Sequence, residues 1–459
     1  MKNQYNDENI LGGRDMKRKK VIVLVLAVVM MTTLFSSCGK KDSIDKSENS
    51  SEPLTLQWWG SFPEDMGPNQ VCEEFNKIDP NVQVEYTRFV NDEAGNTKVD
   101  VSLMSDNTID VFLSLDDVNF QKRIDSGFAY PLDELFDEVG FSLEENYDDT
   151  ISQTEINDHY YGLPAKKLSH VILYNQEMFD EADVAYPSED WTYDEFLDTA
   201  KKLTKGEGTN KVYGYFFPGY DSGQPATSML IGKLGSDWMY AEDGQTANIN
   251  NKDLKYVTEK YLERVKEGIE PSYVDVTTEK MAPESMLLTG RAAMVFGDWI
   301  VRDVKDTENY PHDFKVGFAN MPRIEGQTEN LNTCYSDLMS VNSKSEHPVE
   351  SMKFIKWYIE EGMDYVAPFG RIPASKKYDD EKVTSLLFGG QEELFDMESA
   401  RSVYFAGTDF STRTNLTAAI EINTILTEEF DKAFAGVQSV DETLEKAQKR
   451  ADEKIEKTK

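Results

Sequence analysis

Residues 54–86, LTLQWWGSFPEDMGPNQVCEEFNKIDPNVQVEY, contain the pattern that decides the fold class of this chain. Residues 54–59 alternate like a β-strand, and residues 68–79 place apolar side chains at the spacing of one helix face. Pro80 ends that helix, and residues 82–86 alternate again. A strand, a helix and a second strand in this order predict a βαβ unit, and therefore an α/β fold whose sheets are mostly parallel.

The same alternation extends beyond this segment. Residues 109–113 predict a third strand, followed by the acidic pair Asp116-Asp117 and a helical stretch over residues 120–124. Further helices are predicted over residues 192–203, 253–268, 348–361 and 439–455. The last of these has an apolar stripe that is too short and too rich in alanine for a coiled coil, so we expect it to pack on its own lobe.

Composition excludes several classes of protein. Hydrophobic residues make up 39% of the 459 residues and aromatic residues 11%, which is enough apolar material to exclude wholesale disorder. The length suggests about two to four domains or lobes. The net charge of −36 argues against a nucleic-acid partner, because a polyanion would be repelled. Three cysteines cannot form a disulfide framework, and whether Cys72 and Cys334 pair stays open.

Residues 1–37 are predicted to be a signal peptide. A basic run over residues 17–20 precedes an apolar run over residues 21–35, and small residues follow, which is the order of a secretory signal. Because the uncharged stretch is just long enough to cross a bilayer, a retained membrane anchor is the alternative. Met16 directly precedes the basic run, so we interpret it as the start of translation and residues 1–15 as an over-long gene prediction.

Residues 34–38, LFSSC, resemble the bacterial lipoprotein box. The resemblance implies cleavage before Cys38 and attachment of lipid to this cysteine. Residues 38–53 are polar and rich in serine, and we interpret them as a flexible tether with a reach of ~20 Å. The mature protein is therefore expected on the outer face of the cell membrane, held there by its acyl chains rather than by basic residues.

Signatures of catalysis and of metal binding are missing from the sequence. There is no H-E-x-x-H motif, no P-loop, no G-x-S-x-G nucleophile elbow and no EF-hand loop, and the four histidines lack the spacing of metal ligands. We therefore predict no catalytic residue, no metal and no cofactor. A glycosidase pair of carboxylates remains formally open, since acidic residues are abundant.

Aromatic residues beside Gly, Asp, Asn or Pro at the ends of predicted elements are the remaining candidates for a site. Sugar rings present apolar C–H faces and a rim of hydroxyl groups, so aromatic faces together with Asp and Asn acceptors complement them. Each such residue by itself is more often part of a core. The candidates are Trp58, Trp59, Tyr220, Trp238, Tyr240, Trp299 and Tyr335.

A series of motifs follows in order: WGS at 59–61, EFNKIDPNV at 74–82, SGFAYPLD at 126–133, YGLP at 161–164, GRAAM at 290–294 and GDW at 297–299. In this order and spacing the chain resembles the extracellular solute-binding proteins of bacterial ABC transporters, within the carbohydrate-binding group that includes maltose-binding protein. The resemblance implies a two-lobed, periplasmic-binding-protein-like α/β fold (type II) with the ligand cleft between the lobes. It places lobe one at residues 54–164 and 336–369, and lobe two at residues 165–335 and 370–458.

The resemblance also implies ligand-binding residues. Trp299 falls at the sugar-stacking position of a Gly-x-Trp motif, and Asp117 follows the third strand, where an acid accepts sugar hydroxyls. Tyr220 follows Pro218 as a ligand-facing tyrosine does, and Trp59 ends the first strand, where an aromatic residue lines the cleft. The predicted set is completed by Tyr335, Asp337 and Arg371.

Two departures from the maltose-binding pattern limit what the resemblance implies about the ligand. Ser114 stands where the pattern has a cleft tryptophan, and Lys166-Lys167 replaces apolar residues. We therefore expect a monomeric, lipid-anchored receptor that captures a sugar or oligosaccharide and delivers it to the transmembrane subunits of an ABC permease. The alternatives are a receptor for another small solute, such as a polyamine or a phosphonate, a surface glycan hydrolase, and an adhesion lipoprotein without a small-molecule cleft.

Overall fold

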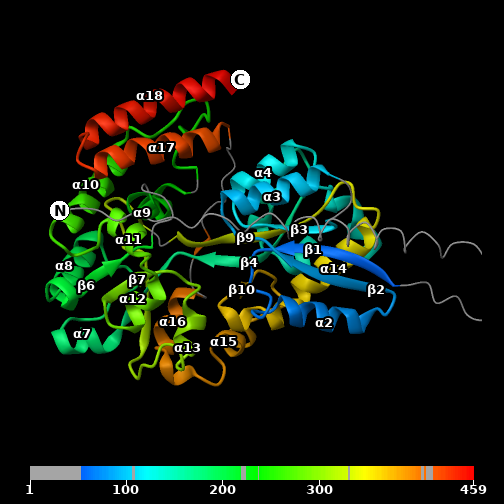
Figure 1. Cartoon of the computed structure of the whole chain (residues 1–459), viewed down its shortest axis with the longest axis horizontal. Coiled ribbons are helices and arrows are strands. Elements are labelled where there is room, and N and C mark those ends of the chain that lie inside the picture. The colour runs from blue at the N-terminus through cyan, green and yellow to red at the C-terminus, as the bar shows by residue number, and fades with distance from the viewer. Residues whose placement is uncertain are drawn as a thin grey trace, which may run out of the picture. The chain divides into compact units, whose positions relative to one another are not determined.

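The computed structural model describes residues 53–105, 109–218, 224–235, 237–328, 331–404, 408–409 and 417–458. These residues form an α/β fold of two lobes, each built on a mixed β-sheet flanked by helices (Figure 1). The predicted signal peptide, Cys38, the tether before Pro53 and Tyr220 lie outside the described residues. No helix within the described part of the chain is long and apolar enough to span a membrane.

The sheet of the first lobe contains, in spatial order, β10 (Ile372–Pro373), β4 (Leu163–Ser169), β9 (Leu331–Val341), β3 (Val111–Ser114), β1 (Leu54–Gly60) and β2 (Val82–Arg88). A further strand, β11 (Thr408–Asp409), pairs with β9. Strands β1, β2 and β3 run parallel, and helix α2 (Pro68–Ile78) connects β1 to β2, so the predicted βαβ unit is confirmed. Strand β9 runs antiparallel to both β3 and β4.

The sheet of the second lobe contains, in spatial order, β6 (Tyr213–Phe216), β7 (Ala292–Phe296), β5 (Val171–Asn175) and β8 (Val316–Asn320). Only β6 and β7 are parallel, because β5 runs antiparallel to both of its neighbours. Both sheets are therefore mixed, and the prediction of mostly parallel sheets is wrong in this detail. Alternating strands and helices in a sequence indicate βαβ units, but they do not show strands such as β9 that pair antiparallel across the fold.

Helices cover both sheets. In chain order the α-helices after α2 are α3 (Glu93–Met104), α4 (Asp117–Asp125), α5 (Phe136–Val139), α6 (Leu143–Asn146), α7 (Gln176–Ala182), α8 (Tyr193–Leu203), α9 (Gln224–Leu234), α10 (Lys252–Lys266), α11 (Tyr273–Glu279), α12 (Pro283–Leu288), α13 (Val301–Lys305), α14 (Pro348–Glu360), α15 (Asp380–Phe388), α16 (Met397–Tyr404), α17 (Ala419–Phe434) and α18 (Val440–Thr458). Short 3₁₀ turns occur at Leu132–Leu135, Asp149–Thr154, Gly208–Asn210, Gly362–Tyr365, Ala367–Phe369 and Glu392–Leu394.

The chain passes from the first sheet to the second at His170, the residue between β4 and β5. The predicted lobe boundaries at 164/165 and 335/336 fall inside β4 and β9, and the boundary at 369/370 falls shortly before β10. The lobe boundaries themselves remain a prediction.

Helix α8 shows how local sequence fixes an element. The Thr192 hydroxyl accepts a hydrogen bond from the Glu195 amide, and the Glu195 carboxylate accepts one from the Thr192 amide, which confirms the predicted capping box. Trp191 packs edge-on against Phe196, with ring centroids 5.6 Å apart, and its indole N–H donates to the Asn320 carbonyl. Trp191 is thus a structural staple and not a cleft residue.

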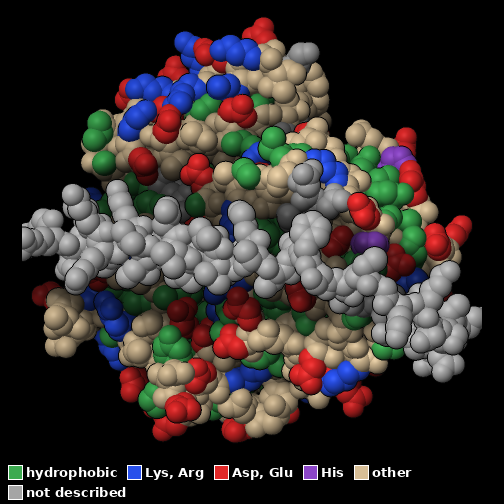
Figure 2. Space-filling view, turned by 45° about the vertical axis from the view of Figure 1, so that its right-hand side comes forward, with side chains coloured by type: hydrophobic (Ala, Val, Ile, Leu, Met, Phe, Trp, Pro, Cys, Tyr) green, Lys and Arg blue, Asp and Glu red, His purple; other side chains and the backbone are tan. Residues whose placement is uncertain are grey.

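Helix α18 packs on its own lobe, as predicted. Its fully buried stripe consists of Leu444, Ala447, Ala451 and Ile455. The outer face is charged, and Lys and Arg side chains gather near the top of Figure 2, at the height where Figure 1 shows α18. Acidic residues of the same lobe compensate part of this charge, since Arg450 pairs with Glu428 and Glu429 at 2.5 and 2.6 Å.

Candidate functional site

A cleft of about 1000 Å³ lies between elements of the two lobes. On the first-lobe side it is lined by the end of β3 and the first turns of α3 and α4, and on the other side by α9, Trp238 and α17. Residues of β9 and of the β4 end complete the lining. Ligands of open α/β sheets bind outside the carboxyl ends of the strands, which is where β3 meets the cleft.

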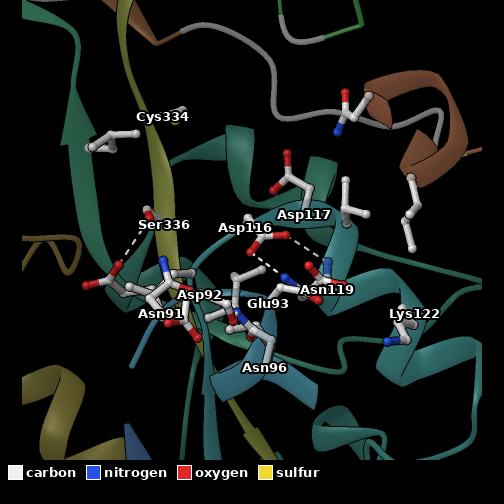
Figure 3. A pocket seen from close by; sticks show the side chains of 18 of the residues that line it. Asn91, Asp92, Glu93, Asn96, Asp116, Asp117, Asn119, Lys122, Cys334 and Ser336 are labelled. Carbon is white, nitrogen blue, oxygen red and sulfur yellow. Dashed lines mark hydrogen bonds between the residues drawn. The ribbon is translucent and has the colours of Figure 1, made fainter. Parts of the chain in front are cut away.

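Two helices begin at the first-lobe wall, each behind an aspartate cap. Asp92 follows β2, and its carboxylate accepts a hydrogen bond from the Gly95 amide at 2.7 Å. Asp116 follows β3 and accepts from the amide and the side chain of Asn119, both at 2.8 Å (Figure 3). Each cap satisfies a backbone N–H of the first turn that has no partner within the helix. The caps therefore hold two acceptors in fixed positions at the cleft.

The first-lobe wall is acidic. It presents the carboxylates of Asp92, Glu93, Asp116 and Asp117 and the amides of Asn91, Asn96 and Asn119 (Figure 3). Lys122 also lines the cleft, but its ammonium group forms a salt bridge with Asp100 at 2.7 Å. A negatively charged wall accepts hydrogen bonds from hydroxyl or ammonium groups and repels anions.

The opposite wall combines an aromatic ring with polar side chains. Trp238 borders the cleft with 6% of its surface exposed, and Ile231 of α9 lines the same wall. Helix α17 contributes Ile420, Asn423, Thr424, Thr427 and Glu428. Ring faces together with amide and hydroxyl groups complement a sugar, whose C–H faces are apolar and whose rim is polar.

Three of the predicted ligand-binding residues line the cleft: Asp117, Tyr335 and Asp337. Tyr335 lies on β9, and its hydroxyl accepts a hydrogen bond from the Asp148 amide at 3.2 Å. Asp337, also on β9, forms a salt bridge with Arg371 at 2.8 Å. Its φ of 56° is uncommon for a residue other than glycine.

Three other predicted residues do not line this cleft. Trp59 is 9% exposed and lies in a small core cluster of the first lobe. The guanidinium of Arg371 lies over the ring of Phe62, 3.4 Å from its centroid. Trp299 is half-buried and contacts Phe296 edge-on, with ring centroids 6.2 Å apart. A role in ligand binding stays a prediction for Trp59, Arg371 and Trp299.

Sequence reasoning does not identify most of the polar lining. A signal exists for Asp92 and Asp116, because each stands between a strand and a helix at the position of an N-cap. No comparable signal marks α17, whose Asn423, Thr424 and Thr427 have the pattern of an ordinary solvated helix face. Only the tertiary fold brings that helix to the cleft.

The two lysines that depart from the maltose-binding pattern have acidic partners. Lys166 is buried and pairs with Asp298 at 3.1 Å, and Lys167 pairs with Asp148 at 3.2 Å. His170 lies close to the first pair and lines the cleft. Burial lowers the pKa of His170 to about 4, against an opposing effect of Asp298 and with a small additional lowering by Lys166.

The pKa of His170 predicts a loss of stability in mild acid. The pKa of His170 in the folded protein lies below the ordinary value of 6.5, so the unfolded chain takes up a proton at higher pH than the folded protein does. The free energy of unfolding is therefore highest above pH 6.5 and falls as the pH is lowered towards 4. The loss amounts to about 3 kcal/mol. A His170→Phe variant, which keeps a ring against Phe296, should lose less stability over this interval when urea unfolding is measured at several pH values. Identical pH profiles of the two proteins would contradict the prediction.

No group of three or more His, Cys, Asp or Glu side chains in the described part of the chain is arranged to hold a metal ion. The two-lobed α/β fold and the polar, partly aromatic cleft between its lobes are the features expected of a solute receptor.

The comparisons with known proteins agree with that class. The family model described as bacterial extracellular solute-binding protein matches residues 60–364, and the chain therefore belongs to this family. A sugar transporter from Rhizobium etli in an open conformation has 22% identity and a TM-score of 0.68, covering 87% of this chain and 99% of its own. An ABC substrate-binding protein from Listeria monocytogenes in complex with cycloalternan has 18% identity and a TM-score of 0.70, covering 89% and 99%. Maltose-bound MalE3 from T. maritima has 16% identity and a TM-score of 0.68, covering 86% and 98%.

Proposed function

We propose that this protein captures a carbohydrate in the cleft and delivers it to the permease of an ABC importer without chemically changing it. The observation that carries the proposal is the make-up of the cleft. Fixed carboxylates and amides on the first-lobe wall face a wall with Trp238 and the hydroxyl and amide groups of α17. Similar folds from Listeria monocytogenes and T. maritima hold cycloalternan and maltose, which supports a sugar ligand.

Binding in such a cleft is expected to favour a closed arrangement of the lobes. A ligand that contacts both walls binds the closed form better than the open form, and this difference in affinity shifts the population. The closed form is then the one that the permease recognises. Small-angle scattering should therefore report a more compact protein when the ligand is added.

A thermal-shift screen followed by calorimetry tests the proposal. The panel contains maltotriose, mannotriose, cycloalternan, spermidine, a phosphonate and free amino acids. A ligand at 100 times its dissociation constant adds about 2.7 kcal/mol to the free energy of unfolding, which is a clear shift. Mass spectrometry of the incubated mixture then shows whether the sugar is unchanged. Release of a smaller sugar, lost on mutation of a cleft carboxylate, would instead establish a glycan hydrolase.

A polyamine is the second candidate ligand, because the first-lobe wall is acidic. Asp92, Glu93, Asp116 and Asp117 lie together there, and the one lysine among the described lining residues is already paired with Asp100. Stabilisation by spermidine and by none of the sugars would favour this candidate. The same charges argue against a phosphonate.

We further propose that the protein is a lipoprotein anchored through Cys38 on the outer face of the cell membrane. The basic, apolar and small residues that end at Cys38 support this proposal. A Cys38→Ala variant should be released from the membrane fraction or remain unprocessed, as followed by fractionation and by labelling with a fatty-acid analogue. A variant that is still acylated and normally anchored would contradict the assignment.

A further inference from the structure

Arg123 of α4 is fully buried behind the first-lobe wall. Its Nε donates to the Asp100 carboxylate at 2.9 Å, and its Nη2 donates to Oδ1 of Asn96 at 2.8 Å. Its Nη1 donates to the Ser114 hydroxyl at 2.8 Å and to the Leu113 carbonyl at 3.3 Å. One guanidinium thus connects α3, α4 and the end of β3, and two of its partners, Asn96 and Ser114, line the cleft.

A guanidinium has donors and no acceptor, so it fixes the orientation of every group that it binds. Asn96 must turn its oxygen to Arg123, and its NH₂ group then points the other way. That NH₂ donates to Oδ1 of Asn91 at 3.1 Å and to the Asp92 carbonyl at 3.0 Å. The oxygen of Asn91 is engaged in turn, and its own NH₂ remains for the cleft that Asn91 lines (Figure 3).

The same reasoning applies to Ser114. Its oxygen accepts from Arg123, and the described residues give its hydroxyl hydrogen no acceptor within the wall. Because Ser114 is only 1% exposed, Arg123 holds this side chain inside the wall, and Asn91 is the side chain whose donor reaches the cleft surface.

We propose that Arg123 is a positioning residue. From its buried position behind the first-lobe wall, it determines which wall side chains present hydrogen-bond donors to the ligand cleft and which present acceptors. Through Asn96 it makes Asn91 present a donor beside the acceptors Asp92 and Asp116. Each sugar hydroxyl both donates and accepts, so a wall that alternates fixed donors with fixed acceptors matches neighbouring hydroxyls of a neutral sugar. The inference rests on the proposed function and adds which residues select the ligand.

The sharpest variant is Asn96→Asp. The new carboxylate still accepts from Arg123, so that buried contact is kept, but it can donate neither to Asn91 nor to the Asp92 carbonyl. The Asn91 amide then turns its NH₂ towards the carboxylate and presents an oxygen to the cleft. We expect calorimetric titration with maltotriose and with mannotriose to show affinity lowered about tenfold or more. Asn91→Asp should give a similar loss, because its carboxylate still accepts from Asn96 and presents an acceptor to the cleft.

A matched pair of substitutions separates positioning from stability. Lysine cannot reproduce the planar fork of arginine, so Arg123→Lys should weaken binding of the same trisaccharides about tenfold. Arg264→Lys changes an equally buried arginine of the second lobe that does not line the cleft, and it should leave the affinity unchanged although it also destabilises the fold. Equal affinities of Arg123→Lys, Asn96→Asp and the unmodified protein would overturn the proposal.

A measurement without ligand keeps this proposal separate from the proposed function. In protein labelled with ¹⁵N at asparagine, the Asn96 side-chain amide should exchange its hydrogens slowly, and the Asn91 amide rapidly. Arg123→Lys should make exchange at Asn96 fast, and Asn96→Asp identifies its signal by removing it. Fast exchange at Asn96 in the unmodified protein would overturn the proposal even if sugars bind. If neither trisaccharide binds but exchange follows this pattern, the carbohydrate assignment fails and the polarity inference stands.

Discussion

A Glu270→Leu variant is expected to lose about 3–5 kcal/mol of the free energy of unfolding. Glu270 is buried in the second lobe, where its carboxylate accepts from Nε of Arg264 at 2.7 Å. Arg264 is fully buried among the rings of Tyr193, Phe196, Tyr215 and Tyr261, and it also donates to the Tyr193 hydroxyl. Removing the carboxylate leaves a guanidinium charge without its counter-ion away from water, and ring faces compensate only part of that cost.

Urea unfolding followed by circular dichroism measures this loss. The matched control is the double variant Arg264→Met with Glu270→Leu, which removes both charges and fills the space with apolar side chains. We expect the double variant to recover most of the lost stability, because replacing a whole buried ion pair is often neutral. A Glu270→Leu protein within about 1 kcal/mol of the unmodified protein would show that the pair contributes little.

Replacing either candidate stacking tryptophan with alanine should weaken sugar binding about 30- to 1000-fold. Trp238 borders the cleft with only 6% of its surface exposed, and we predict that the exposed part of its ring contacts the sugar. The family resemblance places Trp299 at the stacking position of a Gly-x-Trp motif, and its contact with the ligand is a prediction because it does not line the cleft in this structure. Loss of a ring at a central contact costs about 2–4 kcal/mol of binding energy. Calorimetry with the best sugar of the panel measures both effects.

Trp191→Ala is the control for these two variants. Trp191 is buried against Phe196 and lies away from the cleft residues, so its loss should lower stability and leave affinity unchanged. If Trp299→Ala binds as tightly as the unmodified protein with its fold intact, Trp299 has a packing role only. If Trp238→Ala also binds normally, the aromatic part of the proposed site is wrong.

The first lobe could be predicted well at the level of local elements. The strand at Leu54–Gly60, the helix at Pro68–Ile78 and the strand at Val82–Arg88 follow from short-range periodicity, which the sequence displays directly. The antiparallel pairing of β9 with β3 and β4 could not be predicted in the same way. Its partners lie more than a hundred residues away in sequence, and no local pattern encodes that distance.

The residues of the candidate site also differ in how well the sequence predicts their position. Asp117, Tyr335 and Asp337 were predicted from the sequence, Asp117 because it follows the third strand of the family pattern, and all three line the cleft. Trp59 follows the same kind of rule, yet it lies in a small core cluster, since the end of a strand alone does not tell which face a side chain takes.

The sequence by itself determined the α/β class, the capped helices and the acidic character of this protein, because these depend on residue type and short-range spacing. Its family followed from the resemblance of its motifs to those of known proteins. The tertiary structure decided which side chains share the cleft. Asn91, Ser114 and α17 come from distant stretches, and they meet only after β3, α3 and α17 are packed in space. The tertiary structure also decided which wall groups are donors and which are acceptors. The Arg123 guanidinium orients Asn96 only because folding places the two side chains within hydrogen-bonding distance.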